Sequence, residues 1–446
     1  MPTAARRCAY DVVRRTFEQG AYADRAFRSR ADHYELAGRE RAFAMRLAYG
    51  AIQRKATLDY LIEQLTERPI KRLDPALANA LRIGLYQVVY FDGVPEHAAV
   101  NETVELAKRR RRPGHQLVNA VMRRATTQAR SLVESLGEAT PAEAALSHSH
   151  PVWIAELWWD LLGSEQAIAL MKRNNEPAES AVRANTLRVT PEELAGALTT
   201  DGIPVHRDPA VEEAIILDRS YDVHRSRLFT RGALMPQSRA SMLVARCLDP
   251  QPGEGVLELC AAPGGKTTHL AALMGDQGRI VAVELQPGRA RTIEANCERL
   301  GVGCVDVRAG DARAPVYGNG FDRVLVDPPC SDLGTLQSRP DARWRKRPAM
   351  VDALATIQRE ILEAAAVAVR PGGRLVYSTC TINDSENKLQ MTDFLARHGD
   401  FSSVDLTDPY AQVTATAAGD GGSFLQTFPQ LHETDGFFIA ALQRHE

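Results

Sequence analysis

The stretch of sequence that decides the fold is residues 256–268, which read VLELCAAPGGKTT. A short apolar strand runs here directly into a glycine-rich turn and the start of a helix, and such a turn lets the backbone approach a ligand closely. The phosphate-binding pattern G-x-x-x-x-G-K-[ST] is excluded, because Cys260 stands where that pattern needs a glycine. The dinucleotide pattern G-x-G-x-x-G is excluded as well, since no third glycine falls in place.

The chain around this turn, from Gly232 onward, alternates short apolar strands with helical patterns. The predicted strands are 256–259, 280–283, 305–307, 324–326 and 375–377, and the predicted helices lie around 289–300, 351–369 and 385–398. This alternation is typical of a mostly parallel sheet covered by helices on both faces. We therefore predict a Rossmann-like α/β domain over residues 231–446, with ligands at the carboxyl ends of its strands.

Two further domains are predicted before this one. Residues 1–146 have little strand character, and their apolar residues recur at three- and four-residue intervals, which predicts an all-α domain of five to seven helices. Residues 147–230 contain strand-like stretches at 181–185 and 214–217 and a helix that begins after Thr190, which predicts a small α/β connecting domain. The predicted fold class is therefore multidomain, with an all-α, a small α/β and a Rossmann-like α/β part.

Composition limits the class of protein. Of the 446 residues, 44% are apolar and 25% charged, which is typical of a globular protein and excludes a disordered chain. No stretch approaches ~20 consecutive apolar residues, and residues 1–27 mix charged with apolar side chains, so we expect no membrane span, no secretory signal and a cytoplasmic protein. The seven cysteines are never paired as C-x-x-C, which predicts neither a disulfide framework nor a metal site.

Charge is distributed unevenly along the chain. The net charge is only −2, but residues 1–150 carry 24 Lys and Arg against 17 Asp and Glu. A basic front part on a nearly neutral protein favours a polyanionic partner.

Two acids after successive strands indicate which ligand the turn binds. Glu284 ends the second strand, twenty residues after Gly264, and an acid there suits a ribose diol. Asp311 follows the third strand, where we expect it to face an adenine amino group. Because the chain has these two acids and no phosphate motif, the ligand that fits is S-adenosyl-L-methionine.

Two cysteines follow strand ends at the same edge of the predicted sheet. They are Cys330, three residues after Asp327, and Cys380 in the sequence YSTCT. Methylation of cytosine C5 needs such a group, because a thiolate that adds to C6 makes C5 nucleophilic enough to take a methyl group. An acid such as Asp327 near N3 and the exocyclic amine would offset charge on the ring. The residues alone do not choose between the two thiols as the nucleophile.

These motifs resemble the RNA cytosine-5 methyltransferases of the NOL1/NOP2/Sun type. Residues 260–268 resemble the cofactor signature of that family, 327–334 its Pro-Cys motif, 378–381 its Thr-Cys motif, and 435–438 its closing strand. Residues 81–87, 95–102 and 118–124 resemble an RNA-binding domain of the NusB type. The combination implies methylation of one cytosine of small-subunit (16S) rRNA, cytosine 967 in the standard rRNA numbering.

The resemblance also implies roles for single residues. It assigns the nucleophile to Cys380, gives Cys330 a role in releasing the methylated product, and places Asp327 at the base or the cofactor. The implied cofactor contacts are Cys260, Ala261, Ala262, Pro263, Gly264, Gly265, Lys266, Glu284, Arg289, Asp311 and Asp327. Arg183 and Asn185 match an R-x-N-T-L element associated with RNA contact.

The sequence departs from the usual family pattern in a few places. Glu258 stands where Asp is usual, Pro329 where Ala is common, Asp332 where Gly is common, and Gln237-Ser238 where Gln-Asp is typical. None of these changes removes a catalytic atom, but Asp332 lies beside the predicted base pocket.

Two basic clusters are candidates for RNA contact. The first is the run Lys108, Arg109, Arg110, Arg111 and Arg112, for which a merely solvated helix face is the alternative. The second comprises Arg339, Arg343, Arg345, Lys346 and Arg347, with Trp344 among them either stacking on RNA or lying in a core. We expect a flipped or single-stranded target base.

Two other functions remain open from the sequence. The same chemistry could act on transfer RNA, or the chain could be a non-catalytic RNA-binding scaffold in ribosome assembly or antitermination. We expect a monomer whose partner is small-subunit rRNA.

Overall fold

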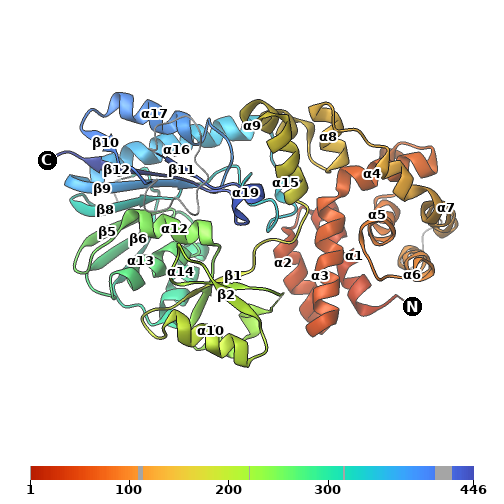
Figure 1. Ribbon diagram of the computed structural model, residues 1–446, viewed down its shortest axis with the longest axis horizontal. Helices are drawn as coiled ribbons and strands as arrows, with labels where there is room; N and C mark the ends of the chain where they lie inside the picture. The colour runs from red at the N-terminus through yellow and green to blue at the C-terminus, as the bar shows by residue number, and fades with distance from the viewer. Residues whose placement is uncertain (1, 109–113, 220, 315–316, 407–423) are drawn as a thin grey trace. The chain divides into compact units, whose positions relative to one another are not determined.

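The computed structural model describes residues 2–108, 114–219, 221–314, 317–406 and 424–446 (Figure 1). Their contacts divide the chain into two compact units. The helical unit comprises Met1–Pro177 together with Leu336–Arg345, and the α/β unit comprises Ala178–Thr335 together with Lys346–Glu446. The helical unit is therefore discontinuous in the sequence.

The helical unit confirms the prediction of an all-α front part. Its elements among the described residues are α1 (Ala4–Gln19), α2 (Ala23–His33), α3 (Gly38–Gln53), α4 (Lys55–Thr66), η1 (Ile70–Arg72), α5 (Pro75–Tyr90), α6 (Glu96–Lys108), α7 (His115–Glu134), α8 (Pro141–Ser147), α9 (Val152–Arg173) and α15 (Ala342–Arg345). The described part up to Ser147 thus has eight α-helices, more than the predicted five to seven. One reason is the break between α3 and α4, which falls at Arg54 with no glycine or proline to mark it.

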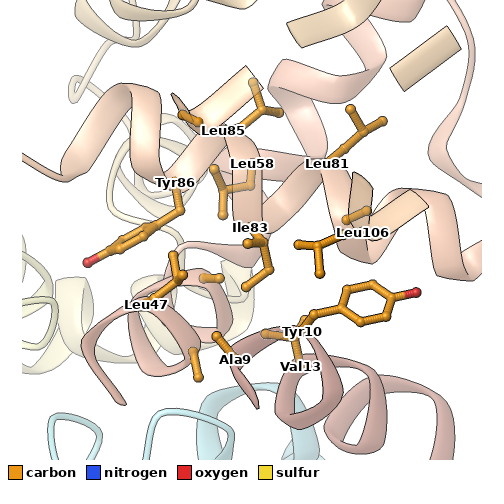
Figure 2. Close-up of a cluster of buried hydrophobic side chains, with 14 of the residues drawn as sticks. Ala9, Tyr10, Val13, Leu47, Leu58, Leu81, Ile83, Leu85, Tyr86 and Leu106 are labelled. Carbon is orange, nitrogen blue, oxygen red and sulfur yellow. The ribbon is translucent and has the colours of Figure 1, made fainter. Parts of the chain in front are cut away.

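Helix α5 is the centre of this unit. Asp74 caps it, Pro75 occupies its first turn, and its residues from Ala76 to Val88 are buried on every side. Figure 2 shows side chains of α5 meeting those of the surrounding helices; the labelled residues are Ala9, Tyr10, Val13, Leu47, Leu58, Leu81, Ile83, Leu85, Tyr86 and Leu106. A helix that is apolar all round is stable only when other helices enclose it.

The segment Leu336–Arg345 belongs to the helical unit although it follows the Cys330 loop in the sequence. The Arg343 side chain is fully buried and donates hydrogen bonds to the backbone oxygens of Ser149 (3.1 Å) and Asn174 (2.8 Å). The indole Nε1 of Trp344 donates to the backbone oxygen of Ile52 at 2.7 Å. The prediction that Arg343 contacts RNA is therefore wrong, and of the two alternatives for Trp344 the structure shows the core position, because both side chains pack within the helical unit.

The α/β unit begins with a small four-stranded antiparallel sheet of order β2-β3-β1-β4. Its elements are β1 (Ala181–Ala184), α10 (Pro191–Thr200), β2 (Val205–Arg207), β3 (Ala214–Leu217), η2 (Val223–Arg225), α11 (Arg227–Thr230) and β4 (Leu234–Pro236). The predicted strands at 181–185 and 214–217 are confirmed as β1 and β3, and Thr190 caps α10 as predicted, in a capping box with Glu193.

The large sheet confirms the predicted Rossmann-like architecture. Its described strands are β5 (Gly255–Leu259), β6 (Arg279–Glu284), β7 (Val305–Ala309), β8 (Phe321–Val326), β9 (Val369–Thr379), β10 (Phe401–Ser403), β11 (Phe424–Gln426) and β12 (Phe438–Arg444). The order is β10-β12-β9-β8-β5-β6-β7, with β11 also pairing with β12. The run from β9 to β7 is parallel, and β10, β11 and β12 are antiparallel additions at the other end.

Helices cover both faces of this sheet, as Figure 1 shows. The elements are α12 (Arg239–Leu248), α13 (Gly265–Leu273) and α14 (Pro287–Leu300) on one face, α16 (Pro348–Ala368) and α17 (Lys388–Arg397) on the other, and the short α19 (Pro429–His432). After β5 the chain continues to β6 on one side, and β8 pairs with β5 on its other side. Ligands of such sheets bind at this change of direction, beyond the carboxyl ends of the strands.

Among the described residues, no helix is long and apolar enough to cross a membrane.

Candidate active site

The glycine-rich turn joins β5 to α13 as predicted. Gly264 has φ +93°, a conformation that side-chain-bearing residues rarely adopt, and its amide donates to the backbone oxygen of Ala261 at 2.8 Å. A Cβ at Gly264 would lie 3.2 Å from Ile293 of α14. Glycine is therefore needed both for the turn and for its packing against α14.

The three predicted acids Glu284, Asp311 and Asp327 all lie close enough to Cys260 to affect its thiol. Burial, with a smaller contribution from the nearby carboxylates of Asp327, Glu284 and Asp311, raises the pKa of its thiol to about 12, although Arg289 acts to lower it. The structure thus brings together residues that follow β5, β6, β7 and β8. A thiol held protonated among three carboxylates is suited to packing rather than to nucleophilic attack.

The two acids expected at the ribose and the adenine differ in exposure. Glu284 is 3% exposed and accepts a hydrogen bond from the backbone amide of Gln286, with Arg289 Nη1 at 3.5 Å. Arg289 also donates to the backbone oxygen of Ala262 at 2.9 Å, so it ties α14 to the turn. The more exposed Asp311 accepts hydrogen bonds from Arg313, which hold the pKa of this carboxyl below its usual range.

Lys266 and Asp327 form an ion pair in the site. Lys266 Nζ lies 2.6 Å from Asp327 Oδ2, and Ser378 Oγ donates to Asp327 Oδ1 at 3.0 Å. Burial opposes the charge on Lys266, but the contact with Asp327 outweighs burial and raises the pKa of the ammonium. Lys266 therefore keeps its positive charge beside Asp327.

Glu258, at the end of β5, is a buried carboxyl beside this pair. It is 1% exposed, and its Oε2 has no hydrogen-bond partner among the described residues. Burial raises its pKa to about 8. An acceptor without a partner, a turn open to close approach and the buried Glu284 carboxylate together suit S-adenosylmethionine, which carries an ammonium group and a ribose diol.

The Glu258→Gln variant is expected to remove part of the pH dependence of stability. Because the folded-state pKa is about 8 and the ordinary value is 4.5, the unfolded chain ionises first as pH rises, so the wild-type free energy of unfolding falls between these values. A glutamine cannot ionise, and relative to wild type the variant is expected to gain about 3 kcal/mol between pH 5 and pH 8. Urea unfolding followed by circular dichroism measures this, and equal pH slopes for both proteins would contradict it.

The two cysteines expected at the reacting base lie side by side. Cys330 Sγ and Cys380 Sγ are 3.3 Å apart. Cys380 Sγ also lies 3.3 Å from Asp332 Oδ1, and the other oxygen of Asp332 lies 2.8 Å from Lys346 Nζ. The thiols therefore share their surroundings with one carboxylate–ammonium pair.

Glu386 ties the two cysteine loops together, and the sequence analysis missed it. It is fully buried, it accepts hydrogen bonds from the amide and the hydroxyl of Ser331, and Asn383 donates to it at 3.3 Å. Ser331 Oγ also lies 2.6 Å from Thr381 Oγ1, next to Cys380. Burial raises the pKa of Glu386. Its position six residues after Cys380 was the only signal in the sequence.

Close contact of two glycines fixes the Cys380 backbone. The amide of Gly334 donates to the backbone oxygen of Cys380 at 3.0 Å, and the amide of Gly436 donates to Gly334 at 2.7 Å. A Cβ on Gly334 would lie 1.9 Å from the oxygen of Gly436. These contacts explain the glycines of the Pro-Cys motif and of the motif before β12.

Comparison with known proteins identifies the family of this chain. Family models match residues 245–443 (16S rRNA methyltransferase RsmB/F), 3–127 (NusB family) and 150–224 (RsmF/B-like ferredoxin-like domain). The chain is 35% identical to a protein of Synechocystis sp. named "Probable ribosomal RNA small subunit methyltransferase B", over 99% of both chains.

The chain belongs to the ribosomal RNA small subunit methyltransferase B family.

Solved structures similar to this family member include the crystal structure of PH0851, with a TM-score of 0.85 and 28% identity over 100% of this chain and 99% of that one. Another is NSun6 from Pyrococcus horikoshii, solved with the S-adenosylmethionine analogue SFG, with a TM-score of 0.60 and 26% identity over 66% of this chain and 98% of that one. The methyltransferase B family is a family of S-adenosylmethionine-dependent methyltransferases.

Two residues expected at RNA in this methyltransferase B chain are buried instead. Arg183 is 1% exposed and donates to Gln237 Oε1 (2.7 Å) and to the backbone oxygen of Gly265 (2.6 Å). Asn185 is 2% exposed and donates to the backbone oxygens of Gly232 and Leu300. These contacts contradict the expected RNA contact, because the two side chains join the small sheet to helices α13 and α14.

The first basic cluster is only partly described. Lys108 is exposed at the end of α6, where its ammonium pairs with Glu105 at 2.7 Å. Arg109, Arg110, Arg111 and Arg112 lie outside the described residues.

Proposed function

We propose that this methyltransferase transfers a methyl group from S-adenosylmethionine to C5 of a cytosine in 16S rRNA, at position 967, through a covalent bond between Cys380 Sγ and C6 of the base. The observation that supports this most is the pair of thiols 3.3 Å apart beyond β8 and β9. Transfer to an amino group needs no thiol, whereas C5 of cytosine becomes nucleophilic only after a nucleophile adds to C6.

The cofactor, when bound, supplies an electrophilic methyl group on its sulfonium. The residues that would hold it are the turn 260–265, with Glu284 at the ribose, Arg289 supporting the turn and Asp311 at the adenine. Its place is the carboxyl edge of β5, β6 and β7.

The chain's own residues act on the base. Asp327, 2.6 Å from Lys266 Nζ, would hydrogen-bond near N3 and the exocyclic amine of the cytosine and offset the charge that develops on its ring. Cys380 would attack C6, and Cys330 would assist release after the C5 proton has left. The division of roles between the two thiols rests on the family resemblance.

The basic run at residues 108–112 remains the candidate phosphate contact. A monomer and a cytoplasmic location also remain predictions.

The experiment measures methyl incorporation from labelled S-adenosylmethionine into unmodified small-subunit rRNA and into bulk transfer RNA, with bisulfite sequencing to locate 5-methylcytosine. A single modified cytosine in small-subunit rRNA is expected. Label in transfer RNA only would keep the chemistry and overturn the substrate, and label in neither would favour an RNA-binding scaffold.

A further inference from the structure

We propose that Asp332 is a further catalytic residue, a general base that takes the proton from the Cys380 thiol as the sulfur attacks the base. This inference rests on the proposed function, in which Cys380 is the nucleophile.

The geometry gives each oxygen of Asp332 one neighbour suited to this role. Oδ1 lies 3.3 Å from Cys380 Sγ, within the range of an S–H···O hydrogen bond, and Oδ2 lies 2.8 Å from Lys346 Nζ. Lys346 is itself positioned by a hydrogen bond of 3.1 Å to the backbone oxygen of Cys330. The ammonium therefore anchors one oxygen of Asp332 and leaves the other directed at the thiol.

The backbone at Asp332 gives a second argument. Its φ is +59°, in the left-handed region that favours glycine, which is common at this position in the family the sequence resembles. Glycine would satisfy the turn without strain, so the turn itself does not call for aspartate. Asp332 keeps a side chain in a backbone conformation that such residues rarely adopt, and it does so beside the reacting atoms. The simplest explanation is that this side chain has a function.

The Asp332 side chain can also pass the proton of the thiol to solvent. It is 22% exposed, so it contacts both solvent and the thiol. The S–H bond would break as an O–H bond forms on Asp332, while the S–C6 bond forms and the C5=C6 electron pair moves toward C5. The C5–CH3 bond would form from this pair as the methyl carbon leaves the cofactor's sulfonium sulfur, which keeps the electrons of the broken S–CH3 bond. Asp332 then gives its proton to water, and the carboxylate is restored.

The charged groups around Cys380 allow a general-base role of Asp332 to be distinguished from a purely structural role. Cys330, Asp332, Lys346 and, from α13, Lys266 face the thiol. The carboxylate accepts a proton during attack, but at rest its negative charge disfavours the thiolate. Removal of this charge should therefore slow methyl transfer and at the same time speed simple alkylation of the thiol.

The test compares wild type with Asp332→Asn in the full-length protein. Single-turnover methyl transfer to unmodified small-subunit rRNA is expected to fall about 100-fold or more at pH 7, and to recover in part as pH rises, because hydroxide then deprotonates the thiol. Alkylation of Cys380 by iodoacetamide, followed by mass spectrometry without RNA or cofactor, is expected to become faster.

Two further variants serve as controls, one for loss of folding and one for loss of a surface charge. Asp332→Gly suits the positive φ and is expected to reproduce both changes, so it replaces the asparagine variant if that one fails to fold. Asp306→Asn removes a surface acid paired with Arg279 and is expected to stay within about twofold of wild type in both assays.

The following results would contradict the role of Asp332 or the proposed function. Methyl transfer by both Asp332 variants within threefold of wild type, or slower alkylation together with slower methyl transfer, would overturn the role of Asp332 and leave the proposed function standing. Absence of methyl transfer by the wild-type protein would overturn the proposed function, and the role of Asp332 in it would fall as well.

Discussion

Replacement of Cys380 with alanine is expected to abolish methyl transfer to RNA, with a loss of at least about 10⁴-fold, whereas Cys330→Ala is expected to accumulate a covalent protein–RNA complex. Without Cys380 no sulfur adds to C6, so C5 stays unreactive. Without Cys330 the adduct forms but is released slowly, because the thiol that lies 3.3 Å from the leaving sulfur is missing. Denaturing gels with labelled rRNA measure the complex, and labelled S-adenosylmethionine measures the transfer.

A cysteine away from the site gives the matched control. Cys304, at the edge of the helix-covered sheet next to β7, is half-buried, and Cys304→Ala is expected to methylate RNA at the wild-type rate without a trapped complex. The reversed pattern, with a trapped complex in Cys380→Ala and no transfer by Cys330→Ala, would give the role of nucleophile to Cys330.

Replacement of Arg343 with alanine is expected to lower the free energy of unfolding of the helical unit by about 3 kcal/mol or more. Its guanidinium is fully buried and donates to the backbone oxygens of Gln53 and Asn174, at the ends of α3 and α9, and to the side chain of Asn175. Burial lowers its pKa to about 9, so it remains charged at neutral pH beside the negative ends of two helix dipoles. Alanine would remove the guanidinium donor from these buried acceptors.

The tryptophans make this measurement specific. All four tryptophans of the chain, Trp153, Trp158, Trp159 and Trp344, lie in the helical unit, so urea unfolding followed by tryptophan fluorescence reports that unit. The exposed Arg339 lies in the same segment, and Arg339→Ala is expected to change stability by no more than about 0.5 kcal/mol. Equal midpoints for the Arg343 and Arg339 variants would refute the structural role of Arg343.

The sheet was predictable where each strand is a continuous apolar run between turns. Strands β6, β8 and β9 contain such runs, at 280–283, 324–326 and 375–377, because both faces of a parallel sheet are covered. Strand β10 has only three residues, two of them exposed serines, and no apolar pattern marks such an edge strand. The short strands β2 and β11 were missed for the same reason.

The candidate site was predictable where a residue directly follows a strand. Glu284, Cys330 and Cys380 could be assigned to one edge because parallel strands end together. Glu386 was not predictable, since its hydrogen-bond partners come from loops more than fifty residues apart.

The contacts of the basic clusters were not predictable from the sequence. Arg343 and Arg183 have the same sequence signature whether they contact phosphate or a protein carbonyl, and the carbonyls that they contact are distant in the chain. Only the fold distinguishes the two cases.

The division of the helical unit into Met1–Pro177 and Leu336–Arg345 has a consequence for synthesis on the ribosome. The final piece of this unit is translated roughly 160 residues after Pro177, a delay on the order of 10–30 s at typical elongation rates. During that interval strands β5 to β8 emerge, while Gln53, Ser149 and Asn174 still lack the guanidinium that their carbonyl groups bind. The amino-terminal unit of this protein therefore cannot complete its folding first, and its last step waits for residue 345 to leave the ribosome.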